Sequence, residues 1–197
     1  MWGKRSKSIF SVFLVVAIIC LLSIYIYGHW QNGRISWKLT LTGKEGTKEL
    51  TFYQIKEMSS YQGWGGFFTS VGVVNGPDKY KGVPVEDLCA QVGGISPKDC
   101  LWVFSPDGYS MVFSYEQVRG DFVAYDPQTL KEIPARGLKM LLGYEKNKTF
   151  FTEEEGKPLR IVLADRQKLL TEGHYWVKWV NKIEIRPVKK GLREDEG

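Results

Sequence analysis

The chain has 197 residues, of which 43% are hydrophobic and 25% are charged, and its formal net charge is +5. This composition is typical of a folded protein of one domain and excludes a disordered or collagen-like chain. The sequence has two histidines and three cysteines, without a CxxC pair. This scarcity argues against a histidine-rich metal centre, a zinc ribbon and a c-type haem site.

The first element is an apolar segment over residues 9–27, which carries no charged side chain. A helix of that length spans about 28 Å, close to the hydrocarbon thickness of about 30 Å. Lys4, Arg5 and Lys7 precede the segment and predict a cytoplasmic N-terminus. A cleaved signal peptide is the alternative, but bulky residues at 25–27 stand where a cleavage site has small ones. We therefore expect an uncleaved, single-pass signal anchor in the cell membrane.

This topology divides the chain into five parts. Residues 1–8 form the cytoplasmic N-terminus, residues 28–35 a linker, residues 36–188 an extracytoplasmic domain and residues 189–197 a charged C-terminal tail. Without the three basic residues before the anchor, the outer part carries about +2 (5 minus 3). So small a charge does not favour nucleic acid as a partner. The expected partners are the membrane and a membrane protein, and the oligomeric state is open.

The first half of the outer domain mixes strand and helix signals. Residues 36–41 alternate between apolar and polar side chains, which predicts a strand. Thr51 and Gln54 have capping-box spacing, which predicts a short helix over residues 52–58. Residues 59–80 contain six glycine or proline residues and no helical period. We expect this segment to be a long irregular loop that packs on the domain and lines a cleft.

The second half is richer in strand patterns. Residues 82–94 predict a helix, with Pro84 near its start and glycines after its end. An Asp-Gly turn joins apolar runs at residues 101–105 and 109–113, which is a hairpin signal. Ser114 and Gln117 have capping-box spacing over one helical turn. Further strands are predicted over residues 138–144, 159–164 and 175–185.

Cys89 and Cys100 have two interpretations. An extracytoplasmic location permits a disulfide between them. The alternative places Cys89 in the core and Cys100 at a strand edge, each as a free thiol. Only the Cα separation decides between the two, and the sequence does not supply it.

Several stretches, in order over residues 37–188, resemble the oxidoreductase molybdopterin-binding domain family of sulfite-oxidase type. They are YKGVPVEDL at 80–88, SPDGY at 105–109, LGYE at 142–145, GKPLRIV at 156–162 and WVKWV at 176–180. The resemblance implies an α+β fold: a mixed β-sheet, barrel-like domain with short helices, here preceded by one transmembrane helix.

The resemblance also implies a molybdenum–pterin cofactor held by a cysteine thiolate upstream of the GVP motif. Residues 28–88 contain no cysteine, and the aligned region, residues 65–75, offers hydroxyl and aliphatic groups, aromatic rings, glycines and the amide of Asn75. Hydroxyls replace a soft thiolate ligand poorly. Molybdopterin is thus the expected cofactor, without molybdenum, and no metal ligand or catalytic residue is assigned.

Four residues are candidate cofactor contacts on the strength of the resemblance. Lys178 and Arg160 would pair with the pterin phosphate, and Asp107 and Tyr109 would contact the ligand from their hairpin turn. The alternative for each is an ordinary surface charge or turn residue. We expect a non-catalytic binding or interaction module. An active oxidoreductase with a non-cysteine molybdenum ligand and a purely structural ectodomain are the other two possibilities.

Overall fold

The computed structural model describes residues 14, 16–23, 35–134 and 137–188. The chain divides into two compact units, Met1–Ser36 and Trp37–Gly197. In the first unit, residues 14 and 16–23 are helical. The rest of the predicted anchor, the N-terminus, nearly all of the linker and the C-terminal tail lie outside the described residues. Within the described ranges, no helix combines the length and the hydrophobicity needed to cross a membrane.

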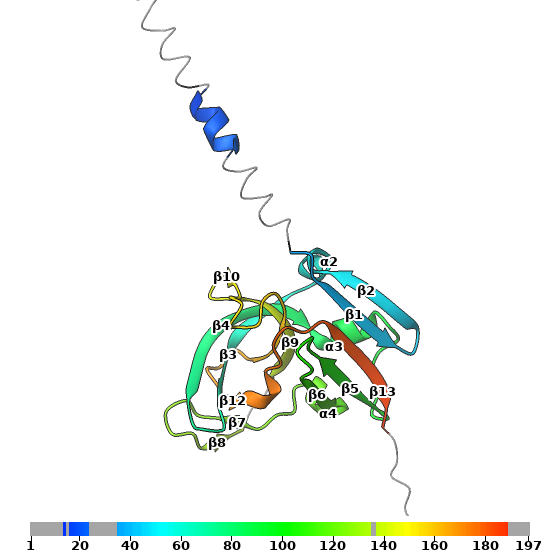
Figure 1. The fold of residues 1–197 in the computed structure, drawn as a ribbon. Coiled ribbons are helices and arrows are strands. Elements are labelled where there is room, and N and C mark those ends of the chain that lie inside the picture. The colour runs from blue at the N-terminus through cyan, green and yellow to red at the C-terminus, as the bar shows by residue number, and fades with distance from the viewer. Residues whose placement is uncertain (1–13, 15, 24–34, 135–136, 189–197) are drawn as a thin grey trace, which may run out of the picture. The chain divides into compact units, whose positions relative to one another are not determined.

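The second unit consists mainly of strands with a few short helices (Figure 1). The helices are α2 (Phe52–Glu57), α3 (Val85–Ala90), α4 (Tyr115–Val118) and the 3-10 helix η1 (Gly173–Tyr175). The strands are β1 (Lys38–Gly43), β2 (Gly46–Thr51), β3 (Tyr61–Phe68), β4 (Val74–Pro84), β5 (Asp99–Phe104), β6 (Ser110–Ser114), β7 (Ala124–Tyr125), β8 (Glu132–Ile133), β9 (Lys139–Lys146), β10 (Thr149–Phe150), β11 (Arg160–Ala164), β12 (Thr171–Glu172) and β13 (Lys182–Pro187).

The strands form two larger sheets and one small hairpin. The first sheet has the order β2-β1-β13-β5-β6, and β1 pairs with β13 in parallel. The second has the order β10-β9-β4-β3-β12, with β11 also paired to β9 and β12 parallel to β3. β7 and β8 pair with each other. Both sheets therefore mix parallel and antiparallel neighbours, as expected for an α+β fold.

The barrel-like part of the expectation is only partly correct. The second sheet curls until Trp64 of β3 meets Asp165, the residue that follows β11. Their backbones exchange hydrogen bonds of 2.6 and 2.8 Å. Beyond this isolated bridge no ladder joins β3 to β11 in the described residues. The sheet is thus strongly curved but is not a closed barrel.

One part of the core lies on one face of the first sheet, and another part is formed by β9 and β11 of the second. Leu39 and Leu41 of β1 are fully buried, as are Leu101 and Val103 of β5 and Ile183 of β13. The residues between them in each strand are partly exposed. This alternation confirms the strands predicted at 36–41 and 101–105.

The predicted helix starts are confirmed by their caps. The Thr51 and Ser114 side chains each accept a hydrogen bond from the backbone N–H three residues later, and Gln54 and Gln117 complete the two capping boxes. The helix predicted over residues 82–94 is shorter, because its first three residues end β4.

Residues 59–80 are not an irregular loop. Most of them form β3 and β4, which are joined by a turn over residues 69–73. The glycines that suggested a loop instead allow close packing. A Cβ on Gly65 would lie 2.2 Å from the carbonyl oxygen of Leu163, so only glycine fits between β3 and the chain that crosses it.

Residues 175–185 are not one strand. β13 begins only at Lys182, and Trp176 and Val177 are consecutive buried residues, which breaks the expected alternation. The segment follows β11 with single hydrogen bonds: Ile161 N–H donates to Val177 O at 2.8 Å, and Val180 N–H donates to Leu159 O at 2.9 Å. Its backbone is thus satisfied without a regular ladder.

The disulfide alternative is wrong in this structure, since Cys89 and Cys100 are both free thiols. Cys89 is fully buried in α3. Cys100 is half-buried in β5, where its Sγ lies 3.5 Å from the carbonyl oxygen of Arg186 in the neighbouring strand β13. Cys89 therefore has the core environment of the alternative interpretation, whereas Cys100 lies in an interior strand of the first sheet, between β13 and β6.

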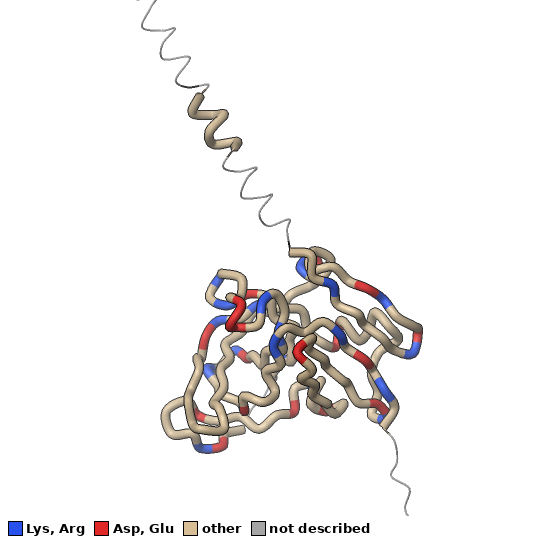
Figure 2. Tube along the Cα trace, viewed as in Figure 1, with Lys and Arg blue, Asp and Glu red and all other residues tan. Residues whose placement is uncertain are grey.

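Basic and acidic residues are interspersed along the described trace of the domain (Figure 2). On β13, Lys182 and Arg186 both pair with Glu184. Their charges lie over the aromatic rings of β5, with Arg186 4.5 Å from the Trp102 ring centroid and Lys182 5.1 Å from that of Phe104. Charges on this face are thus compensated within the sheet.

Candidate functional site

Three of the four candidate cofactor residues line one pocket, here called the Lys178 pocket, with a volume of about 200 Å³. The β5–β6 hairpin supplies one side, and η1 with the segment after it supplies the other. The lining residues are Ser105, Asp107, Tyr109, Gly173, His174, Trp176, Val177, Lys178 and Trp179. The motifs at 105–109 and 176–180, far apart in sequence, therefore meet here.

Lys178 is held by an acidic turn over residues 152–156. Its Nζ donates to Glu154 O at 2.5 Å, while Trp179 Nε1 donates to Glu153 O at 3.1 Å. Gly156 packs directly on the lysine, because a Cβ there would lie 2.8 Å from Lys178 Cβ. Burial, and then the nearby charge of Arg160, lower the pKa of Lys178. A bound anion would oppose both effects by favouring the ammonium form.

Ion pairs and a backbone hydrogen bond fix the position of the acidic turn. Glu155 accepts from Lys146 Nζ at 2.8 Å, and Lys146 also lies 3.2 Å from Asp78. Against the effect of burial, the hydrogen bond from Lys146 holds the pKa of Glu155 below its ordinary value. The same carboxylate accepts from Thr152 N–H at 3.0 Å. The turn that positions Lys178 is thus anchored by an ion-pair network.

Ser105 contributes an unpaired hydroxyl to the pocket. The residue is 7% exposed, and its buried Oγ makes no hydrogen bond of good geometry in the described part of the chain, although it lies near enough to Asp107 to help lower the pKa of that carboxyl. Leaving such a group unpaired costs on the order of 1–3 kcal/mol. A ligand that hydrogen-bonds Ser105 would recover this energy.

Asp107 and Tyr109 form the tip of the hairpin on the opposite side. Tyr109 N–H donates to Asp107 Oδ1 at 2.9 Å, and this bond lowers the pKa of Asp107. The Tyr109 hydroxyl donates to His174 O at 3.0 Å, which ties the hairpin to η1. The pocket therefore has an amine on one side and a carboxylate on the other.

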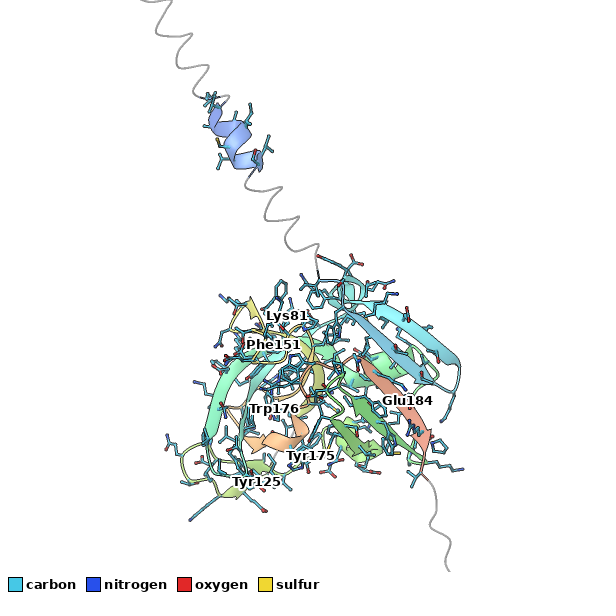
Figure 3. The ribbon with its side chains drawn as sticks, in the orientation of Figure 1. Lys81, Tyr125, Phe151, Tyr175, Trp176 and Glu184 are labelled. Carbon is cyan, nitrogen blue, oxygen red and sulfur yellow. The ribbon has the colours of Figure 1, made fainter. Side chains whose placement is uncertain are left out.

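Trp176 gives the pocket a rigid wall in the interior of the domain (Figure 3). It is 3% exposed, and its indole N–H donates to the Thr171 hydroxyl at 2.8 Å. Trp179, the last lining residue, has a φ of +51°. This left-handed conformation is uncommon for a bulky residue and is typical of functional sites.

Arg160 does not line the pocket, in contrast to the expectation. It is 4% exposed, and its guanidinium donates to Glu155 O at 2.9 Å and to Trp176 O at 3.4 Å. Aromatic rings of Phe67, Phe151 and Trp176 surround it, with centroids 5.3–5.9 Å away. Burial lowers its pKa. Arg160 therefore supports the pocket wall and the acidic turn from behind.

A second cavity adjoins the first, because Gly173 and His174 line both. We call it the Phe68 cavity; its volume is about 350 Å³. Its other lining residues are Phe67, Phe68, Thr69, Ser70 and Glu172. The segment 59–80 thus lines a cleft as expected, although it does so as the end of β3 and the turn after it.

Glu172 and His174 were missed by the sequence analysis as site residues. His174 Nδ1 lies 3.2 Å from Glu172 Oε2, and the Tyr125 hydroxyl donates to Glu172 Oε1 at 3.3 Å. Neither residue belongs to a recognised motif. The one feature of the sequence that could have indicated these two residues was their position just before the motif at 176–180.

The donors in the two cavities do not fit a thiolate-held metal. No cysteine lines either cavity among the described residues. Burial raises the pKa of the Cys89 thiol to about 12, so this thiol is protonated at neutral pH. In the described ranges, no group of three histidine, cysteine, aspartate or glutamate side chains is placed to hold a metal ion. The amine and hydroxyl of the Lys178 pocket, in contrast, fit a phosphate.

Comparison with known proteins gives a family match and similar solved structures. Residues 29–191 match the family described as "Oxidoreductase molybdopterin binding domain". The solved structure of the sulfane dehydrogenase SoxCD from Paracoccus pantotrophus has a similar fold, with a TM-score of 0.57 and 19% sequence identity. The similarity covers 79% of this chain and 40% of that chain, so this chain spans about two fifths of that relative. No curated protein sequence matches.

Proposed function

This chain belongs to the oxidoreductase molybdopterin-binding domain family, and we propose that it is a membrane-anchored, extracytoplasmic module that binds a phosphorylated pterin without molybdenum redox chemistry. The observation that carries the proposal is the donor set of the Lys178 pocket. It offers an amine and an unpaired buried hydroxyl for a phosphate, but no thiolate for a metal.

Each polar group of the pocket has a distinct use for such a ligand. Lys178 would exchange the Glu154 carbonyl for a phosphate oxygen, which is the stronger, charge-assisted partner. Ser105 would donate its hydroxyl to the same phosphate. Asp107, a carboxylate with a lowered pKa, would accept from the amino or ring N–H groups of the pterin. A ligand that is anionic at one end and rich in donors at the other satisfies both sides of the pocket.

The fixed parts of the pocket orient the ligand. Trp176, which is buried and locked by its bond to Thr171, would keep the inner wall of the pocket rigid. Tyr109 and His174 tie the hairpin to η1 through their hydrogen bond and so fix one side of the pocket. A bound metal would add redox chemistry, but the residues present offer it no soft ligand. We therefore assign this chain binding and orientation, and no electron-transfer step.

The anchor and the outward location are supported by the N-terminal unit. The described side chains of residues 14, 16, 18, 19, 21 and 22 are all large and apolar, and each is 49–67% exposed. A helix that is hydrophobic on all sides is unfavourable in water and is typical of a membrane span. The basic residues before it favour a cytoplasmic N-terminus. A membrane protein is the partner that this placement favours.

The test is a pterin and metal analysis of the full chain. The chain would be purified in detergent from its native host under conditions sufficient for cofactor synthesis. Released pterin would be oxidised to its fluorescent form, and molybdenum would be measured on the same sample. We expect close to one pterin per chain and far less molybdenum.

The variant Lys178→Ala should lose at least tenfold of the bound pterin, since a hydrogen bond to a charged group contributes about 1.5–3 kcal/mol. Lys157→Ala is the matched control, because Lys157 is a half-buried lysine of the same region that pairs with Glu153. It should retain the wild-type pterin content. Absence of pterin from the wild-type chain would refute the binding function. One molybdenum per chain would instead establish an active oxidoreductase with a non-cysteine ligand.

A further inference from the structure

The Phe68 cavity differs in chemistry from the Lys178 pocket beside it. Phe67 and Phe68 give it aromatic walls, and Thr69 and Ser70 add hydroxyls. Glu172 is the one carboxylate among the residues that line it, and none of the lining residues is a lysine or arginine. A negatively charged ligand would meet a like charge in this cavity, whereas a cation would meet an opposite one.

Glu172 has hydrogen-bonding capacity left for a ligand. The carboxylate interacts with the Tyr125 hydroxyl and with His174 Nδ1, at 3.3 and 3.2 Å. An ionised carboxylate has about four acceptor positions, so two interactions leave part of its capacity unused. Its side chain is 39% exposed and can be reached by a ligand. After burial, its charge also contributes to the raised pKa values of Tyr125 and Tyr175.

Arg160, the cation that contacts Phe67, is already engaged elsewhere. The Arg160 guanidinium lies 5.5 Å from the centroid of Phe67, but it donates to the carbonyl oxygens of Glu155 and Trp176 and does not line the cavity. Phe68 has no cation against it among the described contacts, and its ring meets Tyr125 edge-on at 4.9 Å. Phe68 and Glu172 are therefore the groups that remain for a cationic ligand.

We propose that the Phe68 cavity binds a small organic cation, an ammonium group on an apolar body, with Glu172 as its counter-ion. Aromatic rings beside a carboxylate attract ammonium groups through cation–π interaction and charge pairing. The volume of about 350 Å³ lies at the lower end of the range for small-molecule sites, roughly 300–1,000 Å³. This ligand is separate from the pterin assigned to the Lys178 pocket.

The rim of the cavity favours an apolar body over a bare ammonium ion. Thr69 and Ser70 begin the turn between β3 and β4, and the next apolar residues of that turn are exposed: Val71 by 82% and Val73 by 55%. This end of β3 also lies beside β12, and β12 in turn contacts β7 (Figure 1). Apolar surface thus continues from the cavity to the solvent, where the body of the ligand can cover it.

The test compares three probes on the full chain in detergent by isothermal titration calorimetry. Phenethylammonium carries the proposed charge on an aromatic body, 2-phenylethanol has a similar shape without the charge, and sulfite is an inorganic oxyanion. We expect phenethylammonium to bind one site per chain, at least tenfold more tightly than 2-phenylethanol. Sulfite should not compete with it. This comparison on the wild-type chain needs no variant.

Two variants then locate the site. Glu172→Gln keeps the shape of the side chain and removes its charge, and it should weaken phenethylammonium binding at least tenfold. Glu132→Gln, on the exposed strand β8, is the matched control and should bind as the wild type does. Equal affinity for the cation and the alcohol, displacement by sulfite, or unchanged binding to Glu172→Gln would each overturn the proposal.

The result is also independent of the pterin function. Lys178→Ala, which should lack pterin, should still bind phenethylammonium with the wild-type affinity. If the chain contains no pterin but binds the cation, the cation site is supported and the pterin proposal alone is refuted. If neither Lys178→Ala nor the wild type binds the cation, the Phe68 cavity is not the site proposed, whatever the pterin content.

Discussion

Cys89 and Tyr80 are two buried residues with weakly acidic side chains. The pKa values of these side chains differ strongly between the folded and the unfolded chain. Burial, with a smaller contribution from Glu86, raises the pKa of Cys89 to about 12. Burial also raises the pKa of Tyr80 to about 12, although the charges of Arg160 and Lys146 oppose it. Both groups stay neutral in the folded chain at alkaline pH. They ionise at lower pH in the unfolded chain, so alkali favours unfolding.

We predict that the free energy of unfolding falls as the pH rises above about 9, the ordinary range for a thiol. Between about pH 9 and 12, the unfolded chain has lost the Cys89 proton that the folded chain keeps. Each such group contributes a slope of about −1.4 kcal/mol per pH unit. Cys89→Ala should remove one such slope in urea unfolding at stepwise pH. Val92→Ala, a buried neighbour without an ionisable group, should keep the wild-type slope. Identical slopes for all three chains would contradict the buried-thiol assignment.

Lys178 and Arg160 show which part of a residue's role the sequence does not predict. Lys178 and Arg160 both lie in motifs of the family, and the sequence assigned both to a phosphate. Lys178 reaches the pocket, whereas Arg160 is enclosed by rings and backbone carbonyls behind it. The difference depends on whether each side chain faces the pocket or the interior of the domain. A motif specifies the residue type but not this tertiary relation.

At the scale of the element, β3 depends on its glycines. We predict that Gly65→Ala destabilises the domain by about 2–3 kcal/mol, because the new Cβ would lie 2.2 Å from Leu163 O and 3.1 Å from the Trp176 ring. Urea unfolding would measure the change. Gln62→Ala, at an exposed position of the same strand, should stay within about 0.5 kcal/mol of the wild type. A neutral effect of Gly65→Ala would show that β3 and the chain crossing it are not packed so closely.

The elements that the sequence predicted well are those with a local cause. The capping boxes at Thr51 and Ser114 and the Asp-Gly hairpin at 107–108 depend on residues a few positions apart, and each is present. The errors have distant causes. The glycines in 59–80 suggested a loop. Their actual role is to make room for the chain that crosses β3, and that chain is about 100 residues away in sequence, so a local pattern does not reveal it. Alternation in 175–185 suggested a strand, although this segment bonds singly to β11.

The same distinction holds for the candidate site. Asp107, Tyr109 and Lys178 were found because stretches that resemble motifs of a known family carry them, and the fold brings them to one pocket. Glu172 has no such motif. Its importance follows only from its neighbours in space, Tyr125 and His174, and from the absence of basic residues among those lining the Phe68 cavity. Residues of this kind are recognised from the charge balance of a cavity.

At the scale of the whole molecule, the two proposed ligands would bind on one domain, which the proposed anchor would tether to a membrane. Gly173 and His174 separate the two cavities and line both. A ligand in either cavity would therefore contact residues that also line the other, while the charged groups proposed for binding, Lys178 and Glu172, each line only one of the two cavities. Tethering restricts this domain to ligands and partners at the membrane surface, provided that the N-terminal segment inserts.

Insertion of that segment is the last prediction. The full chain should remain in the membrane fraction after alkaline carbonate extraction, because residues 9–27 lack a charge. The double variant Ile18→Lys and Leu22→Lys places two charges in the segment, at about 3 kcal/mol each for membrane insertion, and should move the chain out of that fraction. Gln62→Lys adds a charge to the exposed face of β3 instead and should not change the fractionation.

External protease should cut the domain in intact cells if the N-terminus is cytoplasmic. Protection of the domain until lysis would reverse the orientation, and carbonate release of the wild-type chain would remove the anchor from the proposed function.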